Sequence, residues 1–152
     1  MTYKCELIDR PAQPVLSIRT RTAVQNLPQV LGAAYGKIMQ YMGELGEPPA
    51  GAPFVAYYNM DMQDLDIEIG FPVLRALLGK ADIQACEIPA GKAATCLYTG
   101  PYNEIPPAYN DLSAWISQQG YRPSGVAYEF YLNDPQHTPS AELQTLILFP
   151  LV

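Results

Sequence analysis

The chain has 152 residues, enough for one domain with a real core; 49% of them are hydrophobic and 16% are charged, which excludes a disordered protein. The formal net charge is −6 and only nine residues are Lys or Arg, which argues against binding to nucleic acid, because phosphates require clustered basic side chains. No stretch approaches the roughly 20 apolar residues that span a bilayer. The N-terminal residues carry charges where a signal peptide has its apolar segment, so we expect a cytoplasmic protein.

The first half of the chain predicts four strands around one helix. Strands are expected at 3–8 and 15–22, then at 54–60 and 65–73, because apolar and aromatic residues dominate these segments. Between the two pairs, apolar residues recur at steps of three and four from Leu27 to Leu45, the pattern of a helix with one buried stripe. We expect Asn26 to cap this helix and Gly46 to end it.

The second half repeats this order. Strands are expected at 83–88, 93–99, 125–132 and 143–152. Asn103 is the expected cap of a second helix, which Gly120 closes, and Pro106 and Pro107 fit only in a first helical turn. The buried stripe of this helix is predicted to consist of Ile105, Ala108, Tyr109, Leu112, Trp115 and Ile116.

The letters of the two halves also match, which indicates a duplication. Residues 34–46 align with 108–120, and 64–73, ending in Gly-Phe-Pro-Val, align with 142–151, ending in Leu-Phe-Pro-Leu. We therefore predict one α+β domain over 1–152, made of two tandem βαββ repeats at about 1–78 and 79–152, each with a leading strand. The sheet should be mainly antiparallel with two helices on one face, and the junction of the repeats is a natural ligand groove.

Glu129 is the most informative single residue. It lies in the aromatic strand 126–132, and no basic residue follows Arg122 to neutralise it. Burying an unpaired carboxylate is costly, so burial here would favour a role in binding a cation from outside. Because side chains alternate along a strand, Glu129 shares a face with Ala127 and Tyr131, and the competing interpretation is that this face is simply exposed. The letters Ala56-Tyr57-Tyr58 match Ala127-Tyr128-Glu129, which makes Tyr58 the expected repeat mate of Glu129.

Several motifs resemble the GyrI-like (gyrase-inhibitor-like) small-molecule-binding domain, which is similar to the effector-binding domains of AraC-type and MerR-type multidrug regulators. In chain order these motifs are Cys86-Glu87-Ile88-Pro89-Ala90-Gly91, Tyr98-Thr99-Gly100-Pro101-Tyr102, Trp115-Ile116, Gly120-Tyr121 and Tyr128-Glu129-Phe130-Tyr131-Leu132. The resemblance implies tandem strand–helix–strand–strand (SHS2-type) modules and a central groove that binds bulky, often cationic aromatic compounds. It makes Glu129 the central acidic group, with Tyr131 in the same motif and Glu142 at a second acidic position.

Other residues are weaker candidates for the ligand-binding site. Tyr58 and Met60 are expected to line the wall opposite Glu129 and Tyr131, and Tyr102, after Gly100-Pro101, could close the groove. Trp115 lies on the helical core stripe, so packing competes with ligand binding as its role. Glu142 aligns with Asp64, which begins the wet face of its strand, so exposure competes with a site role.

These residues favour binding of bulky hydrophobic, cationic aromatic small molecules, as in multidrug or xenobiotic sensing or sequestration. One alternative is hydrolysis of cyclopropane-type or other xenobiotics with Glu129 as acid and base. Another is inhibition of DNA gyrase, because no helix-turn-helix precedes the domain and the resemblance extends to stand-alone members. We expect no cofactor and no metal, since His137 is a lone loop histidine and Cys5, Cys86 and Cys96 lack metal-type spacing. A homodimer is a further possible partner.

Overall fold

The computed structural model describes residues 4–152, which form eight β-strands and two α-helices. The α+β class predicted from the sequence is confirmed. By contacts the chain divides into two compact units. The first unit consists of residues 11–90; the second consists of residues 91–152 together with the N-terminal segment, described from residue 4 to residue 10.

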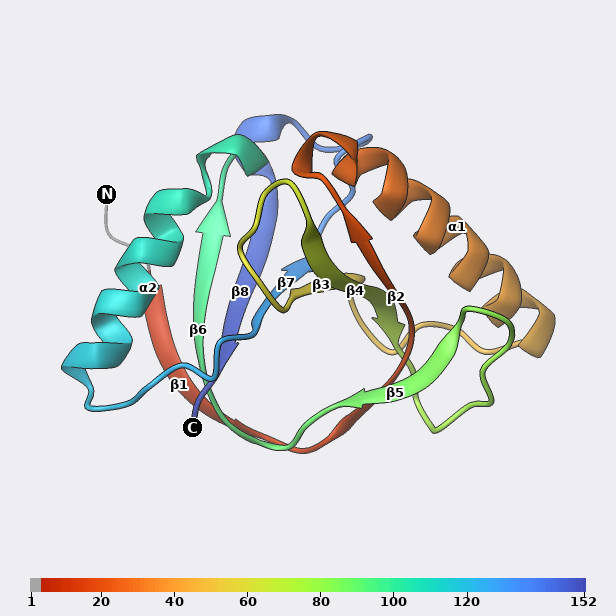
Figure 1. Ribbon diagram of the computed structural model, residues 1–152, viewed down its shortest axis with the longest axis horizontal. Helices are drawn as coiled ribbons and strands as arrows, with labels where there is room; N and C mark the ends of the chain where they lie inside the picture. Colours follow the sequence, from red (N-terminus) through yellow and green to blue (C-terminus); the bar gives the residue numbers. More distant parts are fainter. Residues whose placement is uncertain (1–3) are drawn as a thin grey trace. The chain divides into compact units, whose positions relative to one another are not determined.

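The first unit is a four-stranded antiparallel sheet with one helix on one face. Its strands lie in the order β3, β4, β2, β5, with bounds Phe54–Tyr57, Leu65–Pro72, Gln13–Thr22 and Gln84–Ile88. Helix α1, Leu27–Leu45, packs against β4 and β2 (Figure 1). In β4 the apolar side chains of Leu65, Ile67 and Ile69 are fully buried and alternate with polar ones, as the period-two pattern predicts.

The second unit has the same plan. Its strands lie in the order β1, β6, β8, β7, with bounds Lys4–Arg10, Gly91–Thr99, Gln144–Pro150 and Ala127–Tyr131, and all pair antiparallel. Helix α2, Pro106–Gln118, packs against β6. Short 3₁₀ turns precede each helix, η1 at Val24–Asn26 and η2 at Tyr102–Glu104, and η3 at Ser140–Glu142 precedes β8. Tyr3, where the first strand was expected to begin, lies outside the described residues.

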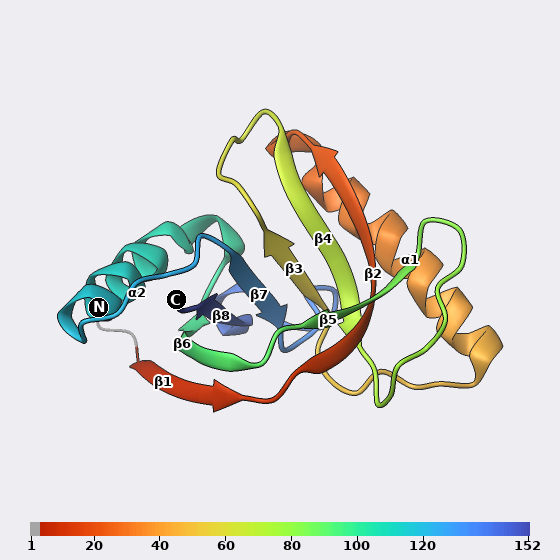
Figure 2. The same ribbon diagram turned by 60° about the horizontal axis from the view of Figure 1, so that its bottom comes forward.

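The leading strand of each repeat pairs with the other repeat. Strand β1 pairs with β6 from Lys4 opposite Leu97 to Arg10 opposite Gly91, and β5 pairs with β2 (Figure 2). The two segments after β1 and β5 therefore do not form hairpins: only Pro11 and Ala12 separate β1 from β2, and only Pro89 and Ala90 separate β5 from β6. Proline fixes φ at about −65°, whereas the two-residue turns that join most hairpins need a positive φ at their first position, where Pro11 and Pro89 lie.

The helix ends follow the sequence signals with two exceptions. Asn26 is the residue before α1, as expected, but its side chain makes no capping hydrogen bond. Gly46 ends α1 with φ of 69°, a left-handed conformation that glycine adopts without a steric penalty. Pro106 and Pro107 occupy the first turn of α2, as predicted. The prediction that Asn103 caps α2 is wrong: residues 102–104 form η2, and Ile105 is the residue before the helix. The two prolines fix where α2 begins, so the asparagine signal three residues upstream is overridden.

The two units match residue by residue in their strand pairing. Val55 lies opposite Ile69 in the first unit, and Glu129 lies opposite Ile147 in the second. The rings of Tyr35 and Phe71 meet edge to face at 5.3 Å, and those of Tyr109 and Phe149 do so at 5.4 Å. Asn59 and Asn133 both donate a side-chain hydrogen bond to a backbone carbonyl just before the last strand of their unit, that of Asp64 or Glu142.

This register corrects the repeat alignment made from the letters. The mate of Glu129 is Val55, not Tyr58, and the shared Ala-Tyr letters were coincidental. The two halves align without a gap from the helices to the asparagine turns. The length difference comes later, because Asn59 precedes its acceptor Asp64 by five positions whereas Asn133 precedes Glu142 by nine.

Candidate ligand site

Glu129 lies in the middle of β7 and its side chain points to the face of the second unit that α2 covers. The residue is 8% exposed. The Tyr109 hydroxyl on α2 donates to Oε2, and the Tyr131 hydroxyl, two residues along β7, donates to Oε1 at 2.9 Å. Within residues 4–152 no Lys, Arg or His makes an ion pair with this carboxylate. The acidic group is thus held by two neutral donors and lacks a counter-charge.

Burial raises the pKa of Glu129 above its ordinary value, because a charged carboxylate loses its hydration in the protein interior. The hydrogen bonds from Tyr109 and Tyr131 act in the opposite direction, since they stabilise the ionised form. The charge of this group therefore depends on its surroundings. A cation placed beside it would favour ionisation, and removal of either tyrosine hydroxyl would favour protonation.

Each of the two tyrosines that donate to Glu129 packs on a second aromatic ring. The Tyr102 ring in η2 meets the Tyr131 ring edge to face at 5.5 Å, and the Tyr109 ring meets Phe149 of β8 in the same way. The pKa of Tyr102 is raised, first by burial and then by the negative charges of Glu129 and Asp134. Rings with polar tips thus gather near one buried charge, and aromatic faces of this kind attract cations.

The structure brings together three of the predicted site residues: Glu129, Tyr131 and Tyr102. The others lie elsewhere in their units. Trp115 is half-buried on α2, and Glu142 is exposed at the end of η3. In the first unit, Met60 is 54% exposed.

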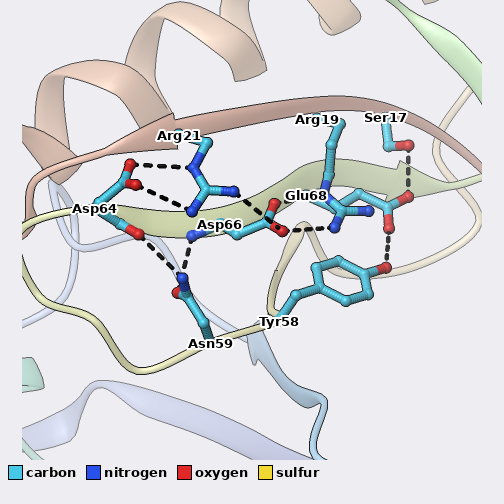
Figure 3. A network of polar contacts seen from close by, with 8 residues as sticks. All are labelled: Ser17, Arg19, Arg21, Tyr58, Asn59, Asp64, Asp66 and Glu68. Atoms are coloured by element: carbon cyan, nitrogen blue, oxygen red, sulfur yellow. Dashed lines mark hydrogen bonds and ion pairs between the residues drawn. The ribbon is translucent and has the colours of Figure 1, made fainter.

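Tyr58 belongs to a polar network on the face of the first unit opposite α1, drawn in Figure 3. Its hydroxyl donates to Oε1 of Glu68 at 2.6 Å, and the Ser17 hydroxyl donates to Oε2 at the same distance. The Arg19 guanidinium lies 3.7 Å from the centre of the Tyr58 ring and also makes a bidentate contact with Asp66. The Arg19 hydrogen bond lowers the pKa of Asp66, so these groups stay paired over the usual pH range.

Sequence reasoning missed Tyr109 as a site residue and assigned it to the helical core stripe. Its hydroxyl reaches Glu129 of β7, so this side chain lies on the part of α2 that faces the sheet. The duplication offered a signal in the sequence, because the alignment places a tyrosine at the same helix position in both halves, Tyr35 and Tyr109. In the structure Tyr35 donates its hydroxyl to the backbone carbonyl of Phe54, the residue before Val55. The same tyrosine position thus contacts main chain in one unit and a carboxylate in the other.

Residues 4–152 contain no group of three or more His, Cys, Asp or Glu side chains that could hold a metal ion. None of the helices that these residues form is long and apolar enough to cross a membrane.

The family model of the GyrI-like small-molecule-binding domain matches residues 3–152. The chain belongs to this family. It is therefore a domain of a small-molecule-binding class, as the resemblance in the sequence implied. No curated protein matches the chain.

Solved structures agree with the fold. The C-terminal domain of EcmrR is 24% identical with a TM-score of 0.88, and the match covers 100% of this chain and 99% of that one. EcmrR in its complex with DNA is 25% identical with a TM-score of 0.84; there the match covers 98% of this chain and 57% of that chain. SAV2435 bound to tetraphenylphosphonium is 12% identical with a TM-score of 0.62, over 100% of this chain and 94% of that one.

Proposed function

We propose that the domain binds bulky, hydrophobic, aromatic organic cations and that Glu129 supplies the counter-charge. The observation that carries this proposal is the buried carboxylate of Glu129, held by the hydroxyls of Tyr109 and Tyr131 and without an ion pair to any residue of 4–152. A bound cation would supply the missing charge. The family membership supports small molecules as the class of ligand.

The chemistry of the site favours a delocalised cation over a small hydrated one. A large aromatic cation loses little hydration on entering an apolar site, whereas an ammonium ion loses much more. Each aromatic ring that it contacts adds roughly 0.5–2 kcal/mol of cation–π attraction. Tyr102, Tyr109 and Tyr131 supply such rings beside the carboxylate. SAV2435, which shares the fold, has been solved with tetraphenylphosphonium, a compound of this kind.

The test compares tetraphenylphosphonium with tetraphenylborate, which has nearly the same shape and the opposite charge. Titration calorimetry should show that the unmodified protein binds the phosphonium and rejects the borate. Glu129→Gln keeps the size of the side chain and removes the charge, so it should weaken phosphonium binding at least tenfold and narrow the difference between the two ions.

Glu142→Gln is the matched control, because Glu142 is an exposed glutamate of the same unit. It should leave the affinity for the phosphonium nearly unchanged. Equal affinity for the phosphonium in the unmodified protein and in Glu129→Gln would remove Glu129 from the site. A larger loss in Glu142→Gln would move the counter-charge to that residue.

Hydrolysis of a strained-ring xenobiotic is the second candidate, and the raised pKa of Glu129 favours it. A carboxyl group whose pKa is raised holds its proton more readily than an ordinary one, which suits a general acid, and it serves as a general base once ionised. Glu129 would accept a proton from water as the water oxygen attacks a cyclopropane carbon, and would return a proton to the carbon released by ring opening. Turnover of a cyclopropane-bearing alkylator that disappears in Glu129→Gln would support this function. If the protein binds the alkylator but does not turn it over, only the binding function is supported.

A further inference from the structure

Two buried hydroxyl groups beside Glu129 make no hydrogen bond. Among residues 4–152, three buried side-chain polar atoms have no partner: Nε of Arg10, Oη of Tyr102 and Oγ1 of Thr145. Thr145 is fully buried, with 0% of its surface exposed. Buried polar groups are nearly always paired, so an unpaired hydroxyl requires an explanation.

Both hydroxyls border Tyr131, which itself donates to Glu129. Thr145 lies directly opposite Tyr131 across the β7–β8 ladder, and the next same-face pair along that ladder is Glu129 with Ile147. The Tyr102 ring packs edge to face on the Tyr131 ring at 5.5 Å. Glu129, Tyr131 and Thr145 therefore share the face of the sheet that α2 covers, and Tyr102 closes on it from η2.

The first unit shows that the fold does not require these polar groups. By strand register, Val55 and Ile67 occupy the positions of Glu129 and Thr145, and both are fully buried. Tyr57 occupies the position of Tyr131. The two units thus share backbone, pairing and the central tyrosine, but only the second unit replaces two buried aliphatic side chains by polar ones. Such a replacement weakens packing unless something pairs with the polar atoms.

We propose that Thr145 and Tyr102 form a second polar subsite, in which their hydroxyls bind an oxygen atom of the ligand while Glu129 faces its positive charge. This inference rests on the proposed function and makes it more specific. The preferred ligands are aromatic cations that carry a hydroxyl or carbonyl oxygen on the aromatic body, rather than cations that consist of hydrocarbon alone.

The physical basis is the cost of leaving buried hydroxyls unpaired. A hydrocarbon cation bound beside Glu129 would leave Oη of Tyr102 and Oγ1 of Thr145 without partners. A ligand oxygen can accept from one or both, since each hydroxyl can donate and accept. Sites built to pair with a ligand hydroxyl discriminate strongly against analogues that lack it. An advantage of about tenfold for the oxygen-bearing ligand is expected from one such hydrogen bond.

The experiment uses two ligands that differ by one oxygen, tetraphenylphosphonium and (4-hydroxyphenyl)triphenylphosphonium. Titration calorimetry on the full chain gives the ratio of their affinities. In the unmodified protein the hydroxylated ion should bind about tenfold tighter. Thr145→Val replaces the hydroxyl by a methyl of the same shape, and Tyr102→Phe removes only the phenol oxygen. In both variants the affinity ratio should fall toward one.

Thr95→Val is the matched control. Thr95 is also buried in the second unit, but it pairs with Leu148 and so lies on the other face of the sheet from Glu129 and Thr145. This variant should retain the affinity ratio of the unmodified protein. A ratio of one in the unmodified protein, or an equal loss in Thr95→Val, would overturn the subsite.

Thermal unfolding of the protein without added ligand tests whether the hydroxyl of Thr145 hydrogen-bonds to an ordered structural water instead of a ligand. If it is unpaired until ligand binds, Thr145→Val should unfold at the same temperature or a higher one. A lower unfolding temperature together with an affinity ratio of one would assign the hydroxyl to a structural water and overturn the inference.

The calorimetry also distinguishes failure of this inference from failure of the proposed function. If neither phosphonium binds, the proposed binding of cations fails, and this inference fails with it. If both bind equally, only the second subsite fails.

Discussion

Tyr109 and Tyr35 are the clearest example of one residue position with two roles. Each stacks edge to face on a phenylalanine of the last strand in its unit, but the hydroxyl of Tyr35 donates to the carbonyl of Phe54 and that of Tyr109 donates to Glu129. The hydrogen bond from Tyr109 lowers the pKa of Glu129 against the larger effect of burial. This tyrosine therefore controls how readily the carboxylate ionises.

Tyr109→Phe should raise the pKa of Glu129 further, because a donor to the ionised form is lost. Under the proposed function tetraphenylphosphonium binds beside the ionised form, so the pH at which its affinity falls to half should move upward. Fluorescence competition titrations from acid to neutral pH measure this midpoint. Tyr35→Phe is the control, because the hydroxyl of Tyr35 donates to a backbone carbonyl. This variant should be less stable, but the pH midpoint of binding should not move. If Tyr109→Phe and the unmodified protein had the same pH midpoint, the hydrogen bond from Tyr109 would not influence the pKa of Glu129.

Glu129 should also make the stability of the protein depend on pH. Burial raises the pKa of Glu129 when the chain folds. At pH values between the ordinary pKa and the raised pKa, the folded protein therefore keeps a proton that the unfolded chain has released. The contribution of this group to the free energy of unfolding therefore falls as pH rises through that interval. Glu129→Gln removes this effect, so the stability of the variant relative to the unmodified protein should increase with pH there and then level off. Urea unfolding at a series of pH values measures the difference; a difference that does not change with pH would show that Glu129 titrates normally.

At the scale of elements, helix α1 contains glycines at positions where its packing does not require them. Gly32, Gly36 and Gly43 all lie inside the helix, and a Cβ at any of them would meet no atom within 4 Å. Gly36→Ala should therefore stabilise the protein by about 0.5–1 kcal/mol, because alanine loses less backbone entropy in a helix. Differential scanning calorimetry should show a rise of about 1–4 °C in the unfolding temperature. A lower unfolding temperature would mean that the helix face is packed after all.

Strand β4 contains the opposite case. A Cβ at Gly70 would lie 2.5 Å from the backbone oxygen of Leu16 and 2.9 Å from Cβ of Ser17. Backbone cannot move aside as a flexible side chain does, so Gly70→Ala should destabilise the first unit by about 1–3 kcal/mol. Urea unfolding of this variant beside Gly36→Ala tests the contrast. Equal stability of Gly70→Ala and the unmodified protein would show that β2 and β4 can separate without cost.

At the scale of the whole molecule, the main feature is the exchange of leading strands. Strand β1 is the first element of the chain, yet it pairs with β6 of the second repeat, while β5 pairs with β2 of the first. Each compact unit is therefore built from both repeats, and the chain passes from one unit to the other after Arg10 and after Ala90. Neither half of the sequence contains all four strands of a unit.

Deletion of residues 1–10 should consequently affect the distant half of the sequence most. Hydrogen exchange measured by mass spectrometry should show faster exchange in β6, which loses its edge partner, and little change in β2, which pairs with β4 and β5. If the truncated chain does not fold, Leu7→Pro offers a milder change, because proline fits poorly inside a paired strand and weakens the pairing of β1 with β6. Faster exchange confined to β2 would contradict the exchange of strands.

The sequence by itself determined the elements and the duplication. Apolar residues at steps of three and four gave both helices, period-two alternation gave strands such as β4, and Gly46 fixed the end of α1. These are local signals, carried by residues a few positions apart. The absence of a basic residue after Arg122 likewise singles out Glu129, an acidic residue in an aromatic strand.

Only the tertiary structure decided which strands pair and which side chains meet. The partner of β1 lies about 85 residues away in the sequence, at β6, and no local pattern distinguishes it from β2. Likewise, the donors to Glu129 and the unpaired hydroxyl of Thr145 depend on strand register, since a shift of one residue turns every side chain to the other face. Register is set by the packing of the whole unit, and for that reason the letters suggested Tyr58 as the mate of Glu129 where the sheet has Val55.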